Sequence, residues 1–117
     1  MNNFTIEEIT NVIKESTEQI RIDPNNASNY LIRAVAYRFK GEFKLAITDL
    51  DKAINLDPEL EGTYNNRGVM YFCLKDFNRS IKDLNEAIRR EPNVAESYYY
   101  RGVLYYQKKI SIKVSQI

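Results

Sequence analysis

Three prolines spaced 34 residues apart, Pro24, Pro58 and Pro92, give this chain of 117 residues a period. A gapless alignment of residues 27–60 with residues 61–94 gives eleven identical pairs: Tyr30/Tyr64, Arg33/Arg67, Val35/Val69, Tyr37/Tyr71, Phe43/Phe77, Ile47/Ile81, Asp49/Asp83, Leu50/Leu84, Ala53/Ala87, Ile54/Ile88 and Pro58/Pro92. A third copy opens at Ala95 and places Tyr98, Arg101, Gly102, Val103 and Tyr105 in the same register. A unit of this length buries its apolar face on its neighbours, so the chain is expected to fold as a stack of repeats.

Each copy has the spacing of two amphipathic helices. Tyr30, Ala34 and Tyr37 recur at intervals of three to four residues, as do Ala46 and Leu50 in the second half of the first copy. Gly41 in the first copy and Lys75–Asp76 in the second interrupt the pattern, which predicts a tight helical hairpin, and the prolines end each second helix. The expected helices span residues 28–40, 43–56, 62–74, 77–90 and 96–109.

Both ends of the chain depart from the repeat. A helix is expected over residues 5–21, with Thr5 and Glu8 at capping-box spacing, in the place of the second helix of an earlier unit. Its outer side can face water, as an N-terminal cap requires. Residues 110–117 alternate apolar and polar side chains, which is strand spacing, and predict an irregular tail. The tail fits a cap over residues 96–109, a segment that pairs with another chain, or a cut or frameshifted part of a longer repeat protein.

The expected organisation is therefore one domain followed by a short tail. The domain comprises residues 1–109, divided into an N-terminal helix (5–21), repeat 1 (27–60), repeat 2 (61–94) and a partial repeat 3 (95–109), and the tail comprises residues 110–117.

Charge and composition argue against several classes of function. Seventeen Lys and Arg residues against 16 Asp and Glu residues give a net charge of +1, too weak a field for electrostatic binding to nucleic acid or to an anionic membrane. Histidine is absent from the sequence, so the usual proton shuttle and zinc ligand are missing, and we expect neither catalysis nor a metal site. The single cysteine, Cys73, is interpreted as a small apolar residue rather than a nucleophile. Without an apolar run of membrane-spanning length or a secretory signal, we expect a cytoplasmic location.

The 34-residue unit resembles the tetratricopeptide repeat (TPR). The residues that carry the resemblance are Tyr30, Ala34, Tyr37, Phe43, Ala46, Ala53 and Pro58; Tyr64, Gly68, Tyr71, Phe77, Ser80, Ala87 and Pro92; and Tyr98, Gly102 and Tyr105. The resemblance implies an all-α fold, a TPR-like solenoid of helical hairpins wound as a right-handed superhelix, with about two and a half repeats and the N-terminal capping helix. It also implies a non-catalytic, cofactor-free adaptor that binds a peptide or protein segment in a concave groove lined by the first helix of each unit.

Carried onto this chain, the resemblance places a mixed apolar and amide surface in that groove. The predicted contact residues are Leu31, Val35, Asn65, Asn66, Val69, Phe72, Tyr99, Val103 and Tyr106. A subgroup of the family grips the C-terminal carboxylate of heat-shock chaperones with Lys, Asn and Arg side chains. This chain has Leu31, Val35, Asn66, Glu96 and Tyr100 in those places, and because only Asn66 matches, the sequence argues against that ligand.

Two further patterns have more than one interpretation. Arg33, Arg67 and Arg101 recur with the repeat and could pair with Asp49 and Asp83 between helices or could form an RNA-binding ladder; the structural pairing is favoured. In the aromatic run, Tyr98 and Tyr105 hold core positions of the repeat, which leaves Tyr99 and Tyr106 for the groove or for the end of the solenoid. An alternative function is therefore structural assembly, in which the last helix and tail mediate homo-oligomerisation.

Overall fold

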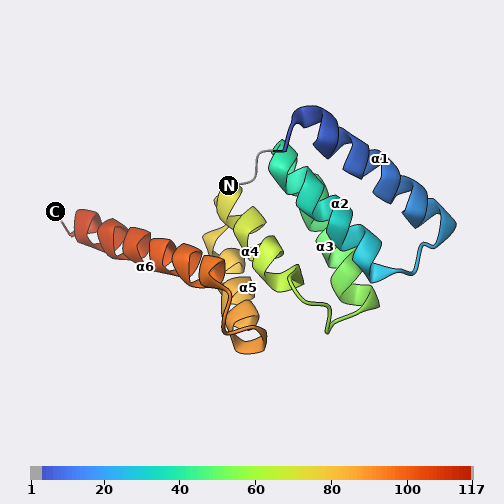
Figure 1. Ribbon diagram of the computed structural model, residues 1–117. Helices are drawn as coiled ribbons and strands as arrows, with labels where there is room; N and C mark the ends of the chain where they lie inside the picture. The colour runs from blue at the N-terminus through green and yellow to red at the C-terminus, as the bar shows by residue number, and fades with distance from the viewer. Residues whose placement is uncertain (1–3, 117) are drawn as a thin grey trace.

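The computed structural model describes residues 4–116, and within this range the chain is entirely helical (Figure 1). The helices are α1 (Ile6–Ile22), α2 (Ala27–Lys40), α3 (Phe43–Leu56), α4 (Thr63–Cys73), α5 (Phe77–Arg90) and α6 (Ala95–Ser115). The expected solenoid of helical hairpins is confirmed. The bounds of α3 and α5 are those predicted, and the starts of the other helices differ by one residue.

Local side-chain chemistry sets the helix ends. Thr5 and Glu8 form the predicted capping box, in which the Glu8 amide donates to Thr5 Oγ1 at 3.1 Å and the Thr5 amide donates to Glu8 Oε2 at 3.0 Å. Asn26 caps α2 by accepting from the Ser28 amide. Gly41 ends α2 in the left-handed conformation at φ 84°, and Lys75 takes the same conformation at φ 62° between α4 and α5.

Consecutive helices pack side by side into an elongated stack with extents of 56 × 30 × 23 Å. In Figure 1, α1 lies against α2, α2 pairs with α3, α4 pairs with α5, and α6 extends beyond the rest of the molecule. The main core joins Ala34, Leu50, Met70, Leu84 and Leu104, which come from all five helices after α1. Burial of these side chains is the main force that holds the units together.

Small residues allow the helices of the second unit to approach closely. A Cβ atom built on Gly68 would lie 3.0 Å from two carbons of the Leu84 side chain, which is fully buried. Ser80 takes the place that Ala46 holds in the first unit, and its hydroxyl donates to the Gly68 carbonyl at 2.7 Å. The polar substitution is therefore accommodated without an unsatisfied group.

The recurring arginines form the predicted structural pairs. Arg33 donates through Nε and Nη2 to the two carboxylate oxygens of Asp49, and Arg67 binds Asp83 in the same way. Each arginine also donates from Nη1 to the second helix of the preceding unit: Arg33 to Thr17, Arg67 to Asp51 and Arg101 to Asn85. These bonds recur every 34 residues, so α1 occupies the place of a second helix, as the sequence indicated.

The C-terminal segment corrects one expectation. Residues 110–117 were predicted to be an irregular tail, but α6 continues to Ser115, and Gln116 closes it; Ile117 lies outside the described residues. Neither proline nor glycine occurs after Gly102, and extending an existing helix costs little compared with starting one. The alternating pattern had no partner strand within the described chain to satisfy its backbone, so helix formation prevails.

Candidate binding surface

The first helices α2, α4 and α6 carry all nine residues predicted to line the groove, but the structure exposes them unequally. Leu31, Val35, Asn66, Phe72 and Val103 are partly exposed, while Tyr99 and Tyr106 are 65% and 66% exposed. These seven side chains reach the surface, although the Asn66 amide is already engaged, because it accepts from Arg38 at 2.9 Å and donates to the Gly62 carbonyl at 2.7 Å.

Two of the predicted contact residues are not available. Val69 is 1% exposed and belongs to the main core, and Asn65 is 8% exposed. The side-chain amide of Asn65 is already engaged, because it accepts from the Ser97 hydroxyl at 2.7 Å and donates to Glu96 Oε1 at 2.9 Å. The expectation that Val69 and Asn65 contact the ligand is therefore corrected: Val69 is buried in the core, and Ser97 and Glu96 of the following unit engage Asn65.

An ion pair crosses the middle of this surface. Arg38 of α2 binds Glu96 of α6 through two N–H donors, Nη1 to Oε1 and Nη2 to Oε2, each at 2.8 Å. Arg38 Nη1 also donates to Asn66 Oδ1 of α4 at 2.9 Å. The resulting network joins the first helices of all three units. The sequence gives no signal that these distant residues meet.

The network keeps both Arg38 and Glu96 in their charged forms. Hydrogen bonds from Arg38, aided by Asn65, lower the pKa of Glu96 even though burial acts in the opposite direction. Burial is the largest single influence on Arg38 and would lower its pKa, but the hydrogen bonds to Glu96 and the negative charge of that carboxylate together raise the pKa. Both groups are therefore ionised at neutral pH, and the Arg38 donors are directed at an internal carboxylate.

Aromatic side chains lie beside the network. Phe72 packs against Tyr100 with ring centroids 5.0 Å apart, and Tyr100 packs edge-on against Tyr99 at 5.1 Å. Tyr98 and Tyr105, predicted to be core residues, are 42% and 52% exposed, because no second helix packs on this side of α6 within residues 4–116. Their expected burial is therefore wrong.

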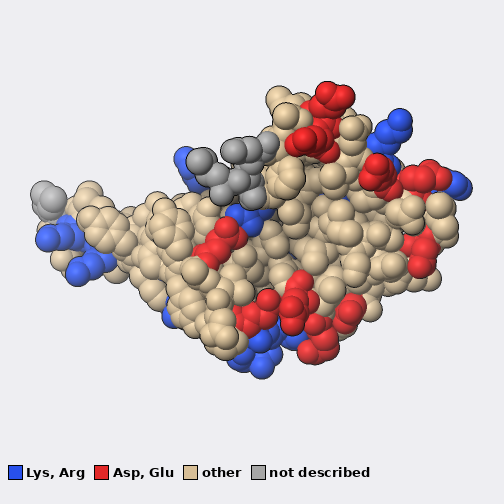
Figure 2. Space-filling view, viewed as in Figure 1, with Lys and Arg blue, Asp and Glu red and all other residues tan. Residues whose placement is uncertain are grey.

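A second apolar region lies between α1 and α2. A cavity of about 350 Å³ is lined almost entirely by apolar side chains, among them Ile9, Val12, Ile32, Val35 and Phe39. On the face shown in Figure 2, acidic groups lie over α1 and along the lower edge, and basic groups lie at the far end of α6. Much of the surface between these charged regions is uncharged, which suits an apolar protein segment.

The surface offers little for chemistry. Burial raises the pKa of the Cys73 thiol, which is the opposite of what activates a nucleophilic cysteine. Among residues 4–116, no group of three or more His, Cys, Asp or Glu side chains is placed to hold a metal ion. No helix in this part of the chain has the length and apolar character needed to span a bilayer.

Comparisons with known proteins agree with this architecture. Residues 34–75 match a TPR repeat family model, and residues 62–94 match a tetratricopeptide repeat model. The chain belongs to the tetratricopeptide repeat family. Domains of this family are generally protein-interaction modules without catalytic activity, and some of them bind peptides. No curated protein sequence matches the chain.

Several solved structures share the fold. The first TPR domain of Spaghetti (RPAP3), bound to the HSP90 peptide SRMEEVD, is 24% identical with a TM-score of 0.84, and the match covers 88% of this chain and 82% of that one. The Arabidopsis OM64 TPR domain is also 24% identical, with a TM-score of 0.83 and coverage of 86% and 84%. The TPR2B domain of yeast Sti1, in a complex with an Hsp70 peptide, is 27% identical with a TM-score of 0.73 and coverage of 90% and 86%.

Proposed function

We propose that this protein is a non-catalytic adaptor that holds an apolar segment of a partner protein against the concave face of its first helices. The observation that carries the proposal is that the first helices, which the Arg38–Glu96 ion pair joins, also carry partly exposed apolar side chains, including Leu31, Val35, Phe72 and Val103. Apolar burial would supply most of the affinity.

The same ion pair defines which ligand the groove rejects. Glu96 already binds the two forked donors of Arg38, so a ligand carboxylate at this position would meet the negative charge of Glu96. Leu31, Glu96 and Tyr100 also supply no cation at the places where the chaperone-binding subgroup of the family has one. The proposal therefore excludes peptides held by a C-terminal carboxylate, and the HSP90 peptide SRMEEVD should not bind.

The experiment selects ligands from a displayed library of random peptides and measures their affinity for matched variants. Leu31→Gln and Val103→Gln remove apolar contact area from the groove and should weaken binding about tenfold or more. Leu45→Gln is the matched control, because Leu45 is an exposed leucine of the second helix α3, away from the groove. Circular dichroism establishes that each variant is folded.

Two results would contradict the proposal. Equal affinity of wild type, Leu31→Gln and Val103→Gln for the selected peptides would remove the groove as the binding surface. Measurable binding of SRMEEVD, lost when its C-terminus is amidated, would overturn the exclusion of carboxylate ligands. Val69→Glu is unsuitable as a groove variant, since it would place a charge in the core.

A further inference from the structure

Helix α6 carries the packing residues of a first helix, but within the described chain no second helix of its own unit packs against it. Tyr98, Arg101, Gly102 and Tyr105 repeat Tyr64, Arg67, Gly68 and Tyr71. A Cβ atom on Gly68 would meet Leu84 of the paired helix α5 at 3.0 Å, whereas a Cβ atom on Gly102 would meet nothing within 4 Å. The surface on α6 that corresponds to a helix-packing face in the second unit is therefore uncovered.

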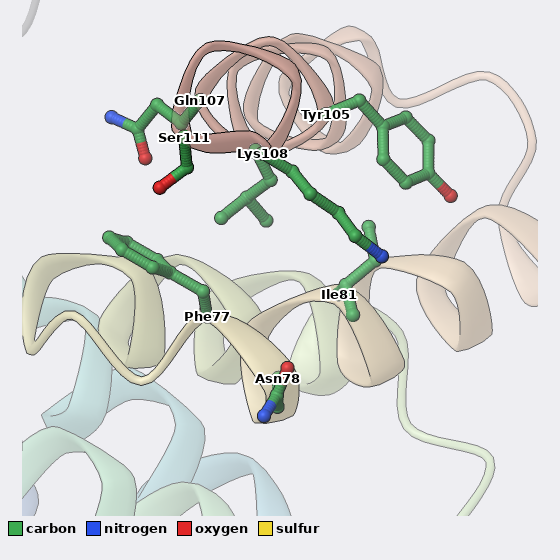
Figure 3. Close-up of a pocket in the computed structure, with 8 residues that line it drawn as sticks. Phe77, Asn78, Ile81, Tyr105, Gln107, Lys108 and Ser111 are labelled. Atoms are coloured by element: carbon green, nitrogen blue, oxygen red, sulfur yellow. The ribbon is translucent and has the colours of Figure 1, made fainter. Parts of the chain in front are cut away.

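A cavity lined by both apolar and polar side chains adjoins this uncovered face. It has a volume of about 400 Å³ and lies between α5 and α6. Figure 3 shows Phe77 and Ile81 of α5 on one side, facing Tyr105 and Lys108 of α6 on the other. The cavity can accept an apolar side chain from a further helix that packs here.

The opposite end of the molecule has the complementary gap. The bond from Arg33 to Thr17 shows that α1 takes the place of a second helix, and its own first helix is missing from the described residues. The apolar cavity along α1 and α2, with Ile9, Val12 and Ile32 in its wall, lies where a first helix would pack. Among the described residues, one end of the stack thus has no second helix and the other end has no first helix.

The two ends of the stack also carry complementary charges. Arg33 and Arg67 each bind an aspartate of their own second helix, Asp49 and Asp83, 16 residues further on. For Arg101, the described structure gives one side-chain bond, to Asn85 of the preceding unit. On α1, Glu15 stands 34 residues before Asp49, so it holds the repeat position of that aspartate, and its side chain is exposed.

Apolar residues at the two ends correspond in the same register. Phe72 of α4 packs against Tyr100 of α6. If α1 of a second copy of the chain served as the missing second helix of α6, the pair at the same repeat positions would be Tyr106 of the first copy and Ile32 of the second copy. Ile9 holds the repeat position of Phe43 and Phe77, so Ile9 of the second copy would be directed at the cavity between α5 and α6 of the first copy. Tyr106 is 66% exposed and Ile32 is 49% exposed, so both are available.

We propose that the chain self-associates head to tail, with α1 of a second copy docked on α6 so that two chains complete one repeat. Glu15 of one copy then binds Arg101 of the next, and Val12 packs near Gly102 in the place that Ala46 and Ser80 hold in the complete units. Because the two surfaces differ, every added copy leaves one of each free, and the association forms an open series rather than a closed dimer.

Sedimentation velocity over a wide concentration range tests the proposal directly. Wild type should show a mass that rises with concentration past that of a dimer. Arg101→Glu and Glu15→Arg place like charges together, and each should weaken association about tenfold or more. An equimolar mixture of the two variants should recover association, because every contact in an alternating series again pairs opposite charges. The double variant should also associate.

Matched controls separate this surface from a general effect of charge. Lys52→Glu and Glu61→Arg make the same changes in net charge at exposed positions outside both docking surfaces and should associate like wild type. A wild type that stays monomeric at every concentration overturns the proposal. Loss of association in Arg101→Glu but not in Glu15→Arg also overturns it, in favour of a symmetric contact between two α6 helices. These readouts use purified protein without a peptide, so they succeed or fail independently of the groove.

Discussion

Arg38 and Glu96 stand 58 residues apart in the sequence, yet two parallel hydrogen bonds of 2.8 Å join their side chains. The pair links α2 of the first unit to α6 of the third unit, across α4. Neighbouring units are also joined by their packed helices, but this bond skips a unit. It therefore contributes to the stability of the stack and defines the polar centre of the concave face.

Replacing Glu96 with Gln should lower the free energy of unfolding by about 1–2 kcal/mol, because Arg38 would keep a partly buried charge without its carboxylate partner. Urea denaturation measures this change. Glu18→Gln is the control, since its pair with Arg21 is exposed to solvent and should contribute little to stability. Equal losses in the two variants would show that the Arg38–Glu96 pair behaves as an ordinary surface contact.

The contribution of Glu96 should depend on pH in a defined direction. Hydrogen bonds from Arg38 lower the pKa of Glu96 below its ordinary value of 4.5, so its stabilising effect is fully present above that value. As the pH falls further, through the pKa of the folded state, the effect is lost. The difference in unfolding free energy between wild type and Glu96→Gln should be constant near neutral pH and shrink below about pH 4.5.

This pH test needs a comparison of wild type with the variant, because the contribution of Glu86 to stability also falls towards acidic pH. Hydrogen bonds from Arg89 and Arg90 lower the pKa of Glu86 to about 2. Subtracting the curve of Glu96→Gln from that of wild type removes this shared effect. A difference that grows towards acidic pH would contradict the assigned role of Glu96.

Two glycines at equivalent positions should respond oppositely to alanine. Gly68→Ala places a methyl group 3.0 Å from Leu84 and 3.3 Å from Asp83 Cβ, and should destabilise the protein by about 1–3 kcal/mol. Gly102→Ala meets open space on α6 and should stabilise it by up to about 1 kcal/mol through helix propensity. Thermal denaturation at low protein concentration checks both. Stabilisation by Gly68→Ala would show that the packing around Gly68 is looser than described, and destabilisation by Gly102→Ala would show that the space beside Gly102 is filled.

Two aspartates that bind the same arginine should differ in how much they contribute to the free energy of unfolding. Asp83 is buried against Arg67, and its replacement by Ala should cost about 2–4 kcal/mol because the guanidinium loses its forked partner. Asp51 binds the same Arg67 from an exposed position, and Asp51→Ala should cost less than about 1 kcal/mol. Chemical denaturation of both variants measures the contrast, and similar costs would mean that burial does not govern these pairs.

Most of the fold could be predicted from the 34-residue register alone. Each repeated position, such as Leu50/Leu84 or Arg33/Arg67, has a packing or pairing role that recurs in every complete unit. The continuation of α6 to Ser115 could not be predicted in this way, because it lies beyond the last repeated position. There the choice between helix and irregular chain rests on the low cost of extending a helix, which an alternating pattern does not reveal.

The binding surface was less predictable than the fold. Val69 falls on the groove side of its helix, but helix periodicity shows only the direction of a side chain and not whether the rest of the fold buries it. The Arg38–Glu96 pair was equally hidden, since neither residue repeats: Arg38 corresponds to Phe72, and Glu96 corresponds to Gly62. Contacts between residues that break the repeat carry no periodic signal.

The bond between Arg38 and Glu96 has a consequence for how the solenoid unfolds. In a stack whose units contact only their neighbours, the terminal units can melt on their own while the middle stays folded. The ion pair links the first unit to the third, so unfolding of either terminal unit removes a bond that stabilises the other one. Fraying at one end is therefore coupled to fraying at the opposite end. The ion pair thereby favours a single cooperative transition in a protein built from only a few repeats.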